Sequence, residues 1–377
     1  MRIFYLLFGL YAASHLYILV CLRRALGPGR YLWPAGIFLL LMAGSWLIRI
    51  GRVPVGMMDG FQTVSFIWMG YALMLVFCLI ALDVSGLLLR LGSRLFDADT
   101  ALFSSARVLR VAFLLSLPLF CWAAYEARTP RTVHLTVTTP YLPAEAEPLE
   151  IVQISDLHIS ALIGPQTLER MRDVVAEKEP DILVLVGDLV DGNMEEREAD
   201  AAVMRTFPAR LAKIAVTGNH EAYHGPEQSL AFIERSGFRI LRAETLEIGG
   251  IRIVGVDDDT FAKAAESDTA DAGPLLRGLT PGTFTLLVQH KPYPPDAPFD
   301  VMLSGHTHGG QIWPGIFATR SVYGFDQGLT ALPEVAGRPR LLNISNGLGF
   351  WGPPIRFFTP PDIVRITIKP ESRPERP

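Results

Sequence analysis

Short polar motifs in the second half of the chain carry side chains that can do metal or acid-base chemistry, and each directly follows an apolar run. Each motif alone is ordinary, since Gly-Asp and Gly-Asn pairs are common in turns. Their joint occurrence, always after an apolar run, favours one shared site over coincidence. The residues concerned are Asp156, His158, Asp188, Asn219, His220, His290, His306 and His308.

The apolar runs indicate the elements that must position these side chains. Segments of helical period, at 167–178 and 195–211, separate runs that are typical of buried strands, which indicates an α/β fold. In such folds ligands bind beyond the carboxyl ends of the strands, where the polar motifs lie. The predicted strands are 132–140, 149–155, 181–186, 213–217, 251–256, 284–289, 299–304, 340–345 and 362–368.

The order of the motifs resembles that of the calcineurin-like metallophosphoesterases, which reads D-x-H, GD, GNH, a single His and GHxH. The chain has DLH at 156–158, GD at 187–188, GNHE at 218–221, His290 and GHTH at 305–308. The resemblance covers residues 131 to 370, and it implies an α/β/β/α sandwich of four layers with two mixed sheets. The longer GHTHGGQ, with SNGLG and PPDIVRITI, is similar to a membrane-anchored subgroup.

The resemblance also implies a site for two divalent metal ions, which would be Mn, Zn, Fe or Mg. Two such ions, about 3.5–4 Å apart, activate a bridging hydroxide for attack on phosphorus and neutralise phosphate oxygens. His220 would stay off the metals and would donate a proton to the leaving oxygen or stabilise phosphate charge. By the same resemblance, Asp156, His158 and His308 would bind one ion, Asp188 would bridge, and Asn219, His290 and His306 would bind the other.

Local geometry offers one reason for the two histidines of GHTH. In an extended segment alternate side chains point the same way, so we expect His306 and His308 to reach two adjacent metals from one strand end. His224 is either a substrate contact or an exposed loop residue, and we favour the loop. For Asp257 to Asp259 we favour a turn or a supporting contact over a third metal.

The predicted substrate class follows from one departure and from the membrane region. Gly192 in GDLVDGN stands where protein phosphatases of this superfamily have an arginine, which argues against phosphoproteins. A site tethered to a membrane meets lipids at high effective concentration, so we expect cleavage of a phosphodiester or pyrophosphate bond in a lipid-linked substrate. The aromatic residues that either line an acyl groove or simply pack are Trp313, Phe350, Trp351, Phe357 and Phe358.

Residues 1–127 form a predicted transmembrane region that precedes a catalytic domain at 128–370 and a polar tail at 371–377. Spans of about 20 apolar residues cross a bilayer, and four segments approach or exceed that length. Arginines are more numerous after the first and third spans, which places the catalytic domain on the extracytoplasmic face of the cell (inner) membrane. The four predicted spans are residues 3–22, 32–48, 61–89 and 108–125.

The net charge limits the classes of partner that the sequence predicts, and one alternative function remains open. The formal net charge of −4 gives no sign of nucleic-acid binding, so the expected partners are the lipid bilayer and a phosphate-ester substrate. The alternative is a non-catalytic membrane scaffold or sensor that retains the metal-binding fold. No ligand position of the family pattern has been lost, which argues against that alternative.

Overall fold

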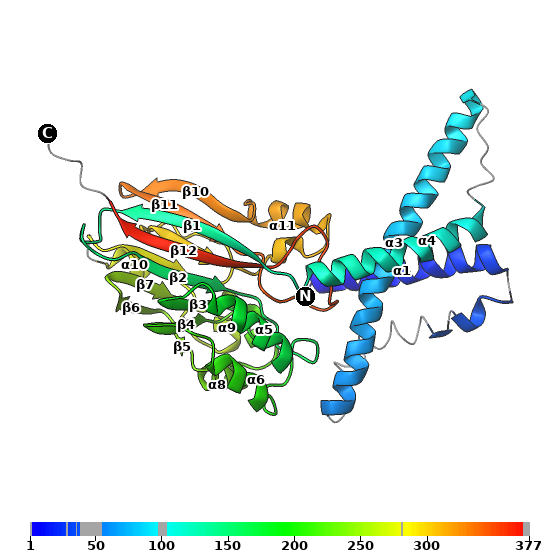
Figure 1. Ribbon diagram of the computed structural model, residues 1–377. Helices are drawn as coiled ribbons and strands as arrows, with labels where there is room; N and C mark the ends of the chain where they lie inside the picture. Colours follow the sequence, from blue (N-terminus) through cyan, green and yellow to red (C-terminus); the bar gives the residue numbers. More distant parts are fainter. Residues whose placement is uncertain are drawn as a thin grey trace. The chain divides into compact units, whose positions relative to one another are not determined.

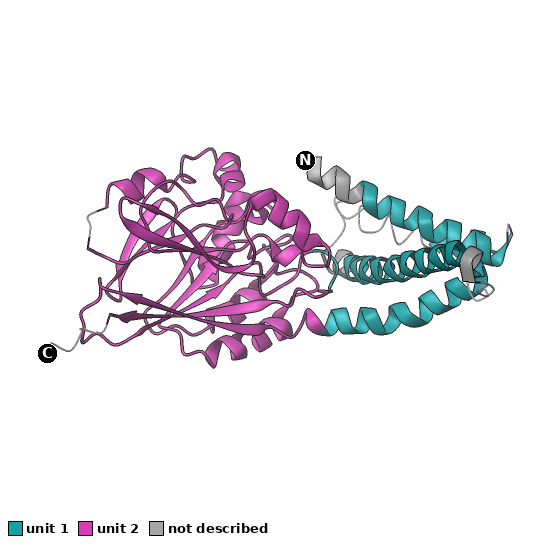
Figure 2. Cartoon of the chain, turned by 90° about the horizontal axis from the view of Figure 1, so that it is seen from above, with its two compact units in different colours: residues 1–125, 352–355 teal, residues 126–351, 356–377 magenta. Residues whose placement is uncertain are grey.

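A computed structural model describes residues 2–27, 29–34, 36–37, 55–96, 104–279 and 282–371. The chain divides into two compact units (Figure 2). The first comprises residues 1–125 with 352–355, and the second comprises residues 126–351 with 356–377. Each unit has its own apolar core, so each is described by itself below.

The first unit is helical, with α1 at Arg2–Leu26, α3 at Val55–Phe96 and α4 at Ser105–Glu126. Among the described residues, Gly60–Gly92 and Ser105–Glu126 are long and apolar enough to cross a membrane. These segments match the third and fourth predicted spans. The first predicted span lies in α1, and most of the second, 32–48, lies outside the described residues. The four-helix transmembrane region is therefore not confirmed, and its first two spans stay predictions.

A histidine links two helices of the first unit. His15 is buried, its Nε2 accepts a hydrogen bond of 2.9 Å from the indole N–H of Trp68, and its Nδ1 lies 3.0 Å from the carbonyl of Tyr11. An imidazole nitrogen can accept a hydrogen bond only when it carries no proton, so this ring is neutral and its other nitrogen is the donor. His15 thus joins α1 to α3 as a neutral hydrogen-bonding group.

The second unit contains two six-stranded sheets (Figure 1). In the first sheet the order is β1-β12-β2-β3-β4-β5, and β2 to β5 are parallel. β12 is antiparallel to β2 and parallel to β1, so the sheet is mixed. The bounds are β1 Arg131–Thr139, β2 Leu149–Ile154, β3 Ile182–Val186, β4 Ala212–Val216, β5 Arg239–Ile240 and β12 Asp362–Pro370.

The second sheet is also mixed, with the order β10-β11-β9-β8-β7-β6. Its four central strands are parallel, and the two edge strands β10 and β6 are antiparallel to their neighbours. The bounds are β6 Glu244–Ile248, β7 Ile251–Gly255, β8 Thr285–Val288, β9 Val301–Ser304, β10 Gly328–Val335 and β11 Arg338–Ile344.

The strand β3 is apolar throughout because both faces of the sheet are covered there. In β3, Val184 belongs to the core between the two sheets, whereas Leu183 and Leu185 pack outward against the helices. A strand buried on both faces needs no polar alternation, which explains the run ILVLV. The helices on this outer face are α5 Pro165–Ala176, α6 Glu198–Arg205 and α8 Pro226–Arg235 (Figure 1).

The outer face of the second sheet has a thinner cover. Leu276 in the five-residue helix α10, Gly273–Arg277, and Phe299 in a loop pack there against Leu287 and Met302. A mixed α/β fold with two sheets is therefore confirmed, but the outer layer on this side is largely loop. The remaining helical turns are α7 Asn219–Tyr223, α9 Asp259–Ala264, the 3-10 turn His308–Gly310 and α11 Gly315–Tyr323.

The helix predicted at 195–211 was too long at its carboxyl end, since α6 stops at Arg205. Pro208 follows shortly after, and a proline cannot donate the hydrogen bond that would continue the helix. The sequence reading did not find α8, α11 or the edge strands β5, β6 and β10. Edge strands such as β10 alternate between half-buried and exposed residues and lack a continuous apolar run.

Two phenylalanines of the second unit provide a test of where its core lies. Phe299 is fully buried against the second sheet, whereas Phe317 in α11 is 63% exposed. Phe299→Ala should lower the free energy of unfolding by about 3–5 kcal/mol because it leaves a cavity. Phe317→Ala should change it by less than about 0.5 kcal/mol. Denaturant unfolding followed by circular dichroism would measure both, and equal losses would contradict this assignment of the core.

Candidate metal centre

The predicted site residues come together at the carboxyl ends of parallel strands from both sheets. Asp156 follows β2, Asp188 follows β3 and Asn219 begins α7 after β4. In the second sheet, His290 follows β8 and His306 follows β9. The strands end in one place because the two sheets pack face to face, so side chains far apart in sequence lie within a few ångströms.

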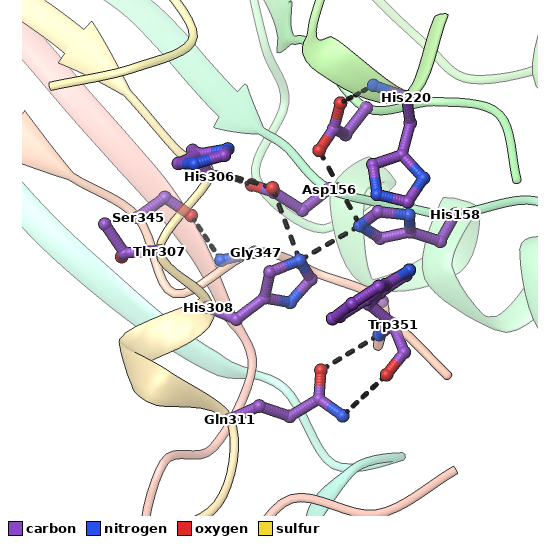
Figure 3. Close-up of polar contacts among 12 residues, drawn as sticks. Asp156, His158, His220, His306, Thr307, His308, Gln311, Ser345, Gly347 and Trp351 are labelled. Atoms are coloured by element: carbon purple, nitrogen blue, oxygen red, sulfur yellow. Dashed lines mark hydrogen bonds and ion pairs between the residues drawn. The ribbon is translucent and has the colours of Figure 1, made fainter. Parts of the chain in front are cut away.

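One group of potential ligands consists of Asp156, His158 and His308, all buried (Figure 3). The Nε2 atoms of His158 and His308 are 2.9 Å apart, and His308 Nε2 is 3.4 Å from Asp156 Oδ1. The ligand atoms of these three residues all lie within 4.8 Å of one another. An ion held there would receive one carboxylate and two imidazoles.

A second group consists of Asp188, His290 and His306. His290 Nε2 lies 3.2 Å from Asp188 Oδ2 and 3.2 Å from His306 Nδ1. The other ring nitrogen of His290 lies 2.8 Å from the carbonyl of Val186 and can donate to it, which leaves Nε2 free to act as a ligand. Asp188 Oδ2 is also 4.0 Å from His158 Nε2, so this carboxylate faces both groups.

Asn219 provides an independent test of whether these residues fit a metal ion. Its side-chain Oδ1 is buried and has no hydrogen-bond partner among the described residues. A buried amide oxygen without a partner is costly, and native structures usually satisfy it. A cation would satisfy it here, and the mixed set of carboxylate, imidazole and amide suits a first-row divalent metal.

His220 lies beside both groups, and Asp191 orients it. Its Nδ1 is 3.4 Å from Asp191 Oδ1, and its ring meets that of His158 edge to face with centroids 4.5 Å apart. His158, Asp191 and His220 together form a third, overlapping group that could hold an ion. The role of His220 away from the metals therefore stays a prediction. Sequence reasoning missed Asp191, although it lies three residues after Asp188 in GDLVDGN.

His224 is not a free loop residue. Its Nε2 lies 2.9 Å from Asp191 Oδ1, the same carboxylate oxygen that faces His220. His224 does lie in the turn that follows α7, as favoured from the sequence, but it is half-buried rather than exposed because its imidazole faces Asp191. Two histidines four residues apart share one carboxylate, which fixes the position of Asp191.

The backbone at these positions departs from the extended geometry expected from the sequence. Asp156, His158, Asp188, His306 and His308 all have positive φ, between 50° and 68°. Residues with side chains avoid this left-handed region, and functional sites commonly hold such strain. The two GHTH histidines reach different groups as expected, but through a tight turn, His308–Gly310 being a 3-10 turn. The alternation argument for an extended strand was wrong.

Two glycines are required because carboxylates press against their backbone. A Cβ on Gly218 would lie 2.2 Å from Asp188 Oδ1, and one on Gly305 would lie 2.4 Å from Asp156 Oδ2. Neither distance is compatible with a side chain. These glycines of GNH and GHTH therefore make room for the metal-facing aspartates.

Glu221 fixes two of the motif loops to each other. Its fully buried carboxylate accepts hydrogen bonds from the backbone N–H groups of Asp188, Leu189, Val190 and Gly218, at 2.6 to 3.2 Å. A buried carboxylate must be compensated in this way. The fourth residue of GNHE thus holds the GD loop in place, a role that the sequence motif did not reveal.

Arg356 similarly fixes the GHTH loop to a neighbouring loop. Its fully buried guanidinium donates to the carbonyls of His308, Gly347, Gly349 and Thr359, at 2.6 to 3.3 Å. One of its nitrogens also lies 3.1 Å from His308 Nδ1. It therefore ties the His308 turn to the SNGLG loop. No sequence signal marked Arg356, because a lone arginine between apolar residues is normally exposed.

The structure separates the five aromatic residues whose role was left open. Phe350 and Phe357 are buried and pack, whereas Trp313 and Phe358 are 41% and 67% exposed. Trp351 is half-buried and meets His220 edge to face, with ring centroids 5.8 Å apart (Figure 3).

Asp257 accepts hydrogen bonds from Thr217 and Arg242, and Asp258 caps α9. These aspartates are supporting residues, as favoured from the sequence.

Burial and mutual charge divide the site into neutral and charged groups. Burial lowers the pKa of His158 and of His306 to about 3, so both are neutral at pH 7. Burial also opposes the charge of Asp188, but His290 and His220 hold its pKa well below the usual value. Conversely, burial is outweighed at His220, where Asp188 and Asp191 raise the pKa to about 9.

Ligands from two mixed sheets, with one carboxylate facing both groups, define a metal-dependent phosphoesterase. Residues 149–310 match the family described as Calcineurin-like phosphoesterase. An uncharacterized metallophosphoesterase of Aquifex aeolicus is 35% identical over 244 residues, which cover 63% of this chain and 92% of that protein. The chain therefore belongs to the calcineurin-like metallophosphoesterase family and is a metal-dependent phosphoester hydrolase.

Two further proteins are similar to the chain. A transmembrane protein with metallophosphoesterase domain from Danio rerio is 26% identical over 353 residues, covering 88% of this chain and 79% of that protein. This alignment is longer than the second unit, so it includes part of the helical region. A solved dimetal phosphatase from Danio rerio has a TM-score of 0.29 and 12% identity, covering 54% of this chain and 88% of that one.

Metal binding should strengthen as the pH rises. Burial disfavours the charged form of His290, but Asp188 and then Asp156 raise its pKa to about 10, so a proton must leave before the ring can bind an ion. Burial raises the pKa of Asp156 to about 6. The Zn²⁺ affinity should therefore rise about tenfold per pH unit between about pH 7 and 9, and more steeply below about pH 6.

Titration of the purified chain with Zn²⁺ against a competing chelator measures this dependence. His134→Gln, an exposed histidine on β1, is the matched control and should leave the curve unchanged. A Zn²⁺ affinity that stays flat between about pH 7 and 9 would contradict the charged state assigned to His290.

Proposed function

We propose that the protein is a membrane-anchored phosphoesterase that uses two divalent metal ions to hydrolyse a phosphodiester or pyrophosphate bond in a lipid-linked substrate. The observation that carries this proposal is the position of Asp188, whose Oδ2 faces His290 at 3.2 Å and His158 at 4.0 Å, one from each ligand group. When bound, two ions in such a site supply charge neutralisation and an activated water.

Different residues of the site would bind the metal ions and donate the proton. Asp156, His158 and His308 would hold one ion, and His290, His306 and Asn219 the other, with Asp188 between them. His220, held by Asp191, carries a proton at neutral pH because its pKa is raised, and it can donate that proton to the leaving oxygen. The Asp191 carboxylate keeps the imidazole in one orientation.

The proposed class of bond is supported by the absence of an arginine at one position of the described site. The described part of the GDLVDGN loop has Gly192 where an arginine would clamp a phosphomonoester, and Gly192 has a φ of 146° that disfavours other residues. A diester or pyrophosphate carries less charge on the reacting phosphorus and requires less clamping. This supports a diester or pyrophosphate rather than a phosphoprotein.

Lipid linkage is supported by the helices and by a relative. Gly60–Gly92 and Ser105–Glu126 are apolar enough to span a bilayer, and a similar protein of Danio rerio is named as a transmembrane protein. We infer four spans, membership of the membrane-anchored subgroup with GHTHGGQ, and a catalytic unit on the extracytoplasmic face of the inner membrane. The bilayer is then a partner and the source of the phosphate ester.

Detergent-purified protein should hydrolyse bis(4-nitrophenyl) phosphate faster than 4-nitrophenyl phosphate when supplied with Mn²⁺, Zn²⁺, Fe²⁺ or Mg²⁺. Elemental analysis should find about two ions per chain. Asp188→Asn should remove both bound metal and activity, because it weakens both ligand groups. Two bound ions with no turnover of either ester would favour the scaffold or sensor alternative instead.

A matched pair of histidines tests proton donation. His220→Gln should lower kcat by about 10²–10⁴ while metal content is unchanged, because it removes the proton donor and no ligand. His224→Gln, which alters the other partner of Asp191, should have a much smaller effect. Loss of metal in His220→Gln would show that this residue belongs to the overlapping group with His158 and Asp191.

A further inference from the structure

Exposed apolar residues gather at and before the surface helix α11. None of its residues is buried, and Trp313, Phe317 and Val322 are 41%, 63% and 58% exposed. Trp313 and Pro314 directly precede the helix, and Phe317 and Ala318 follow in its first turn, so exposed apolar residues gather at the amino end of α11. Val322 lies in the last turn, about 140° around the helix axis from Phe317. The charged residue of the helix, Arg320, pairs with Asp326 at 3.4 Å.

Phe358 extends this group from a distant part of the sequence. It is 67% exposed, and its ring lies 4.5 Å from that of buried Phe357. The N–H of Trp313 donates to the carbonyl of Phe357 at 3.0 Å, which fixes the two segments together. Ile316 of α11 and Phe358 also line the same cavity of about 290 Å³. We call Trp313, Phe317 and Phe358 the apolar patch.

The position of Phe358 relates the patch to the end of a candidate membrane helix. Its N–H donates to the carboxylate of Glu126 at 2.8 Å, and Glu126 is the last residue of α4. In the last turn of α4, Trp122 and Tyr125 are 54% and 60% exposed, with ring centroids 6.0 Å apart. Aromatic residues at the end of an apolar helix mark the level of the membrane surface.

The patch also borders the metal centre. Tyr323, the last residue of α11, meets the ring of His306 edge to face with centroids 5.6 Å apart. Its other side faces Tyr293, at 5.2 Å. The helix begins a few residues after GHTHGGQ and contacts the His308–Gly310 turn. A surface that binds α11 would therefore lie close to the metal centre.

We propose that the apolar patch docks on the surface of the lipid bilayer and brings the metal centre within reach of the phosphate groups of membrane lipids. This rests on the proposed function, in which α4 crosses the bilayer. Exposed tryptophan and phenylalanine side chains are residues that enter the membrane interface. Exposed Arg131, which lines the cavity beside Phe358, adds a positive charge suited to lipid phosphate.

Fluorophore labelling of the full chain in nanodiscs tests the docking directly. An NBD label would be attached through Phe317→Cys or Phe358→Cys, with Cys21, Cys78 and Cys121 replaced by serine. The nanodiscs contain phosphatidylcholine and phosphatidylglycerol, with or without doxyl-labelled lipid. We expect doxyl quenching at both patch positions. A label through Leu211→Cys, an exposed leucine outside the patch, should not be quenched.

A label through Trp122→Cys separates failure of this proposal from failure of the anchor. If Trp122→Cys is quenched and the patch positions are not, docking is overturned while the membrane anchor stands. If none of the labels is quenched, α4 does not cross the bilayer and both ideas fall. Self-association of the chain that shields the patch labels without lipid would overturn docking, because the patch would then be a protein interface.

Turnover gives a second readout that structural damage alone would not reproduce. The probes are soluble bis(4-nitrophenyl) phosphate and hexadecyl 4-nitrophenyl phosphate held in vesicles of the same lipids. Phe317→Ser combined with Phe358→Ser should lower turnover of the vesicle-held diester about tenfold and leave the soluble diester unchanged. Leu211→Ser should alter neither. Equal loss on both diesters, or no loss on either, would overturn the proposal.

Discussion

The burial of four imidazoles and two carboxylates within a few ångströms of one another is the constraint on which the rest of the second unit depends. Asp156, Asp188, His158 and His290 are almost without solvent, and they could not share this space unless their charges were compensated. Without metal, the compensation is a proton on His290 facing Asp188. With metal, bound cations would replace that proton, so the same geometry serves both states.

Such groups must be held rigidly, and in this chain backbone conformation and hydrogen bonds to the backbone hold them. Strand ends from both sheets supply the ligands, and the left-handed backbone at five of these residues turns them inward. Glu221 and Arg356 then tie the loops together through backbone N–H and carbonyl groups. Each is a buried charge satisfied almost entirely by the main chain, so removing either would leave several backbone groups unpaired.

The convergence of the candidate ligands and the two mixed sheets could be predicted because the polar motifs follow apolar strands, and both this pattern and the family order are local in sequence. Asp191, Glu221 and Arg356 could not, because their roles depend on loops that meet only after the sheets pack. The partner of His224 was missed for the same reason: a histidine four residues beyond His220 meets Asp191 only when the turn after α7 brings them together. The turn at GHTH was misread because a positive φ at a histidine has no sequence signal.

The same distinction applies to the aromatic residues near the metal centre. Phe357 and Phe358 are identical neighbours, yet one is buried and the other is the most exposed aromatic of its loop. Phe358 has a left-handed backbone, with a φ of 58°, and its N–H donates to the carboxylate of Glu126, the last residue of α4. The proposed docking would use the exposed side chains of Phe358 and Trp313. Their exposure is consistent with an apolar surface that has lipid for a partner.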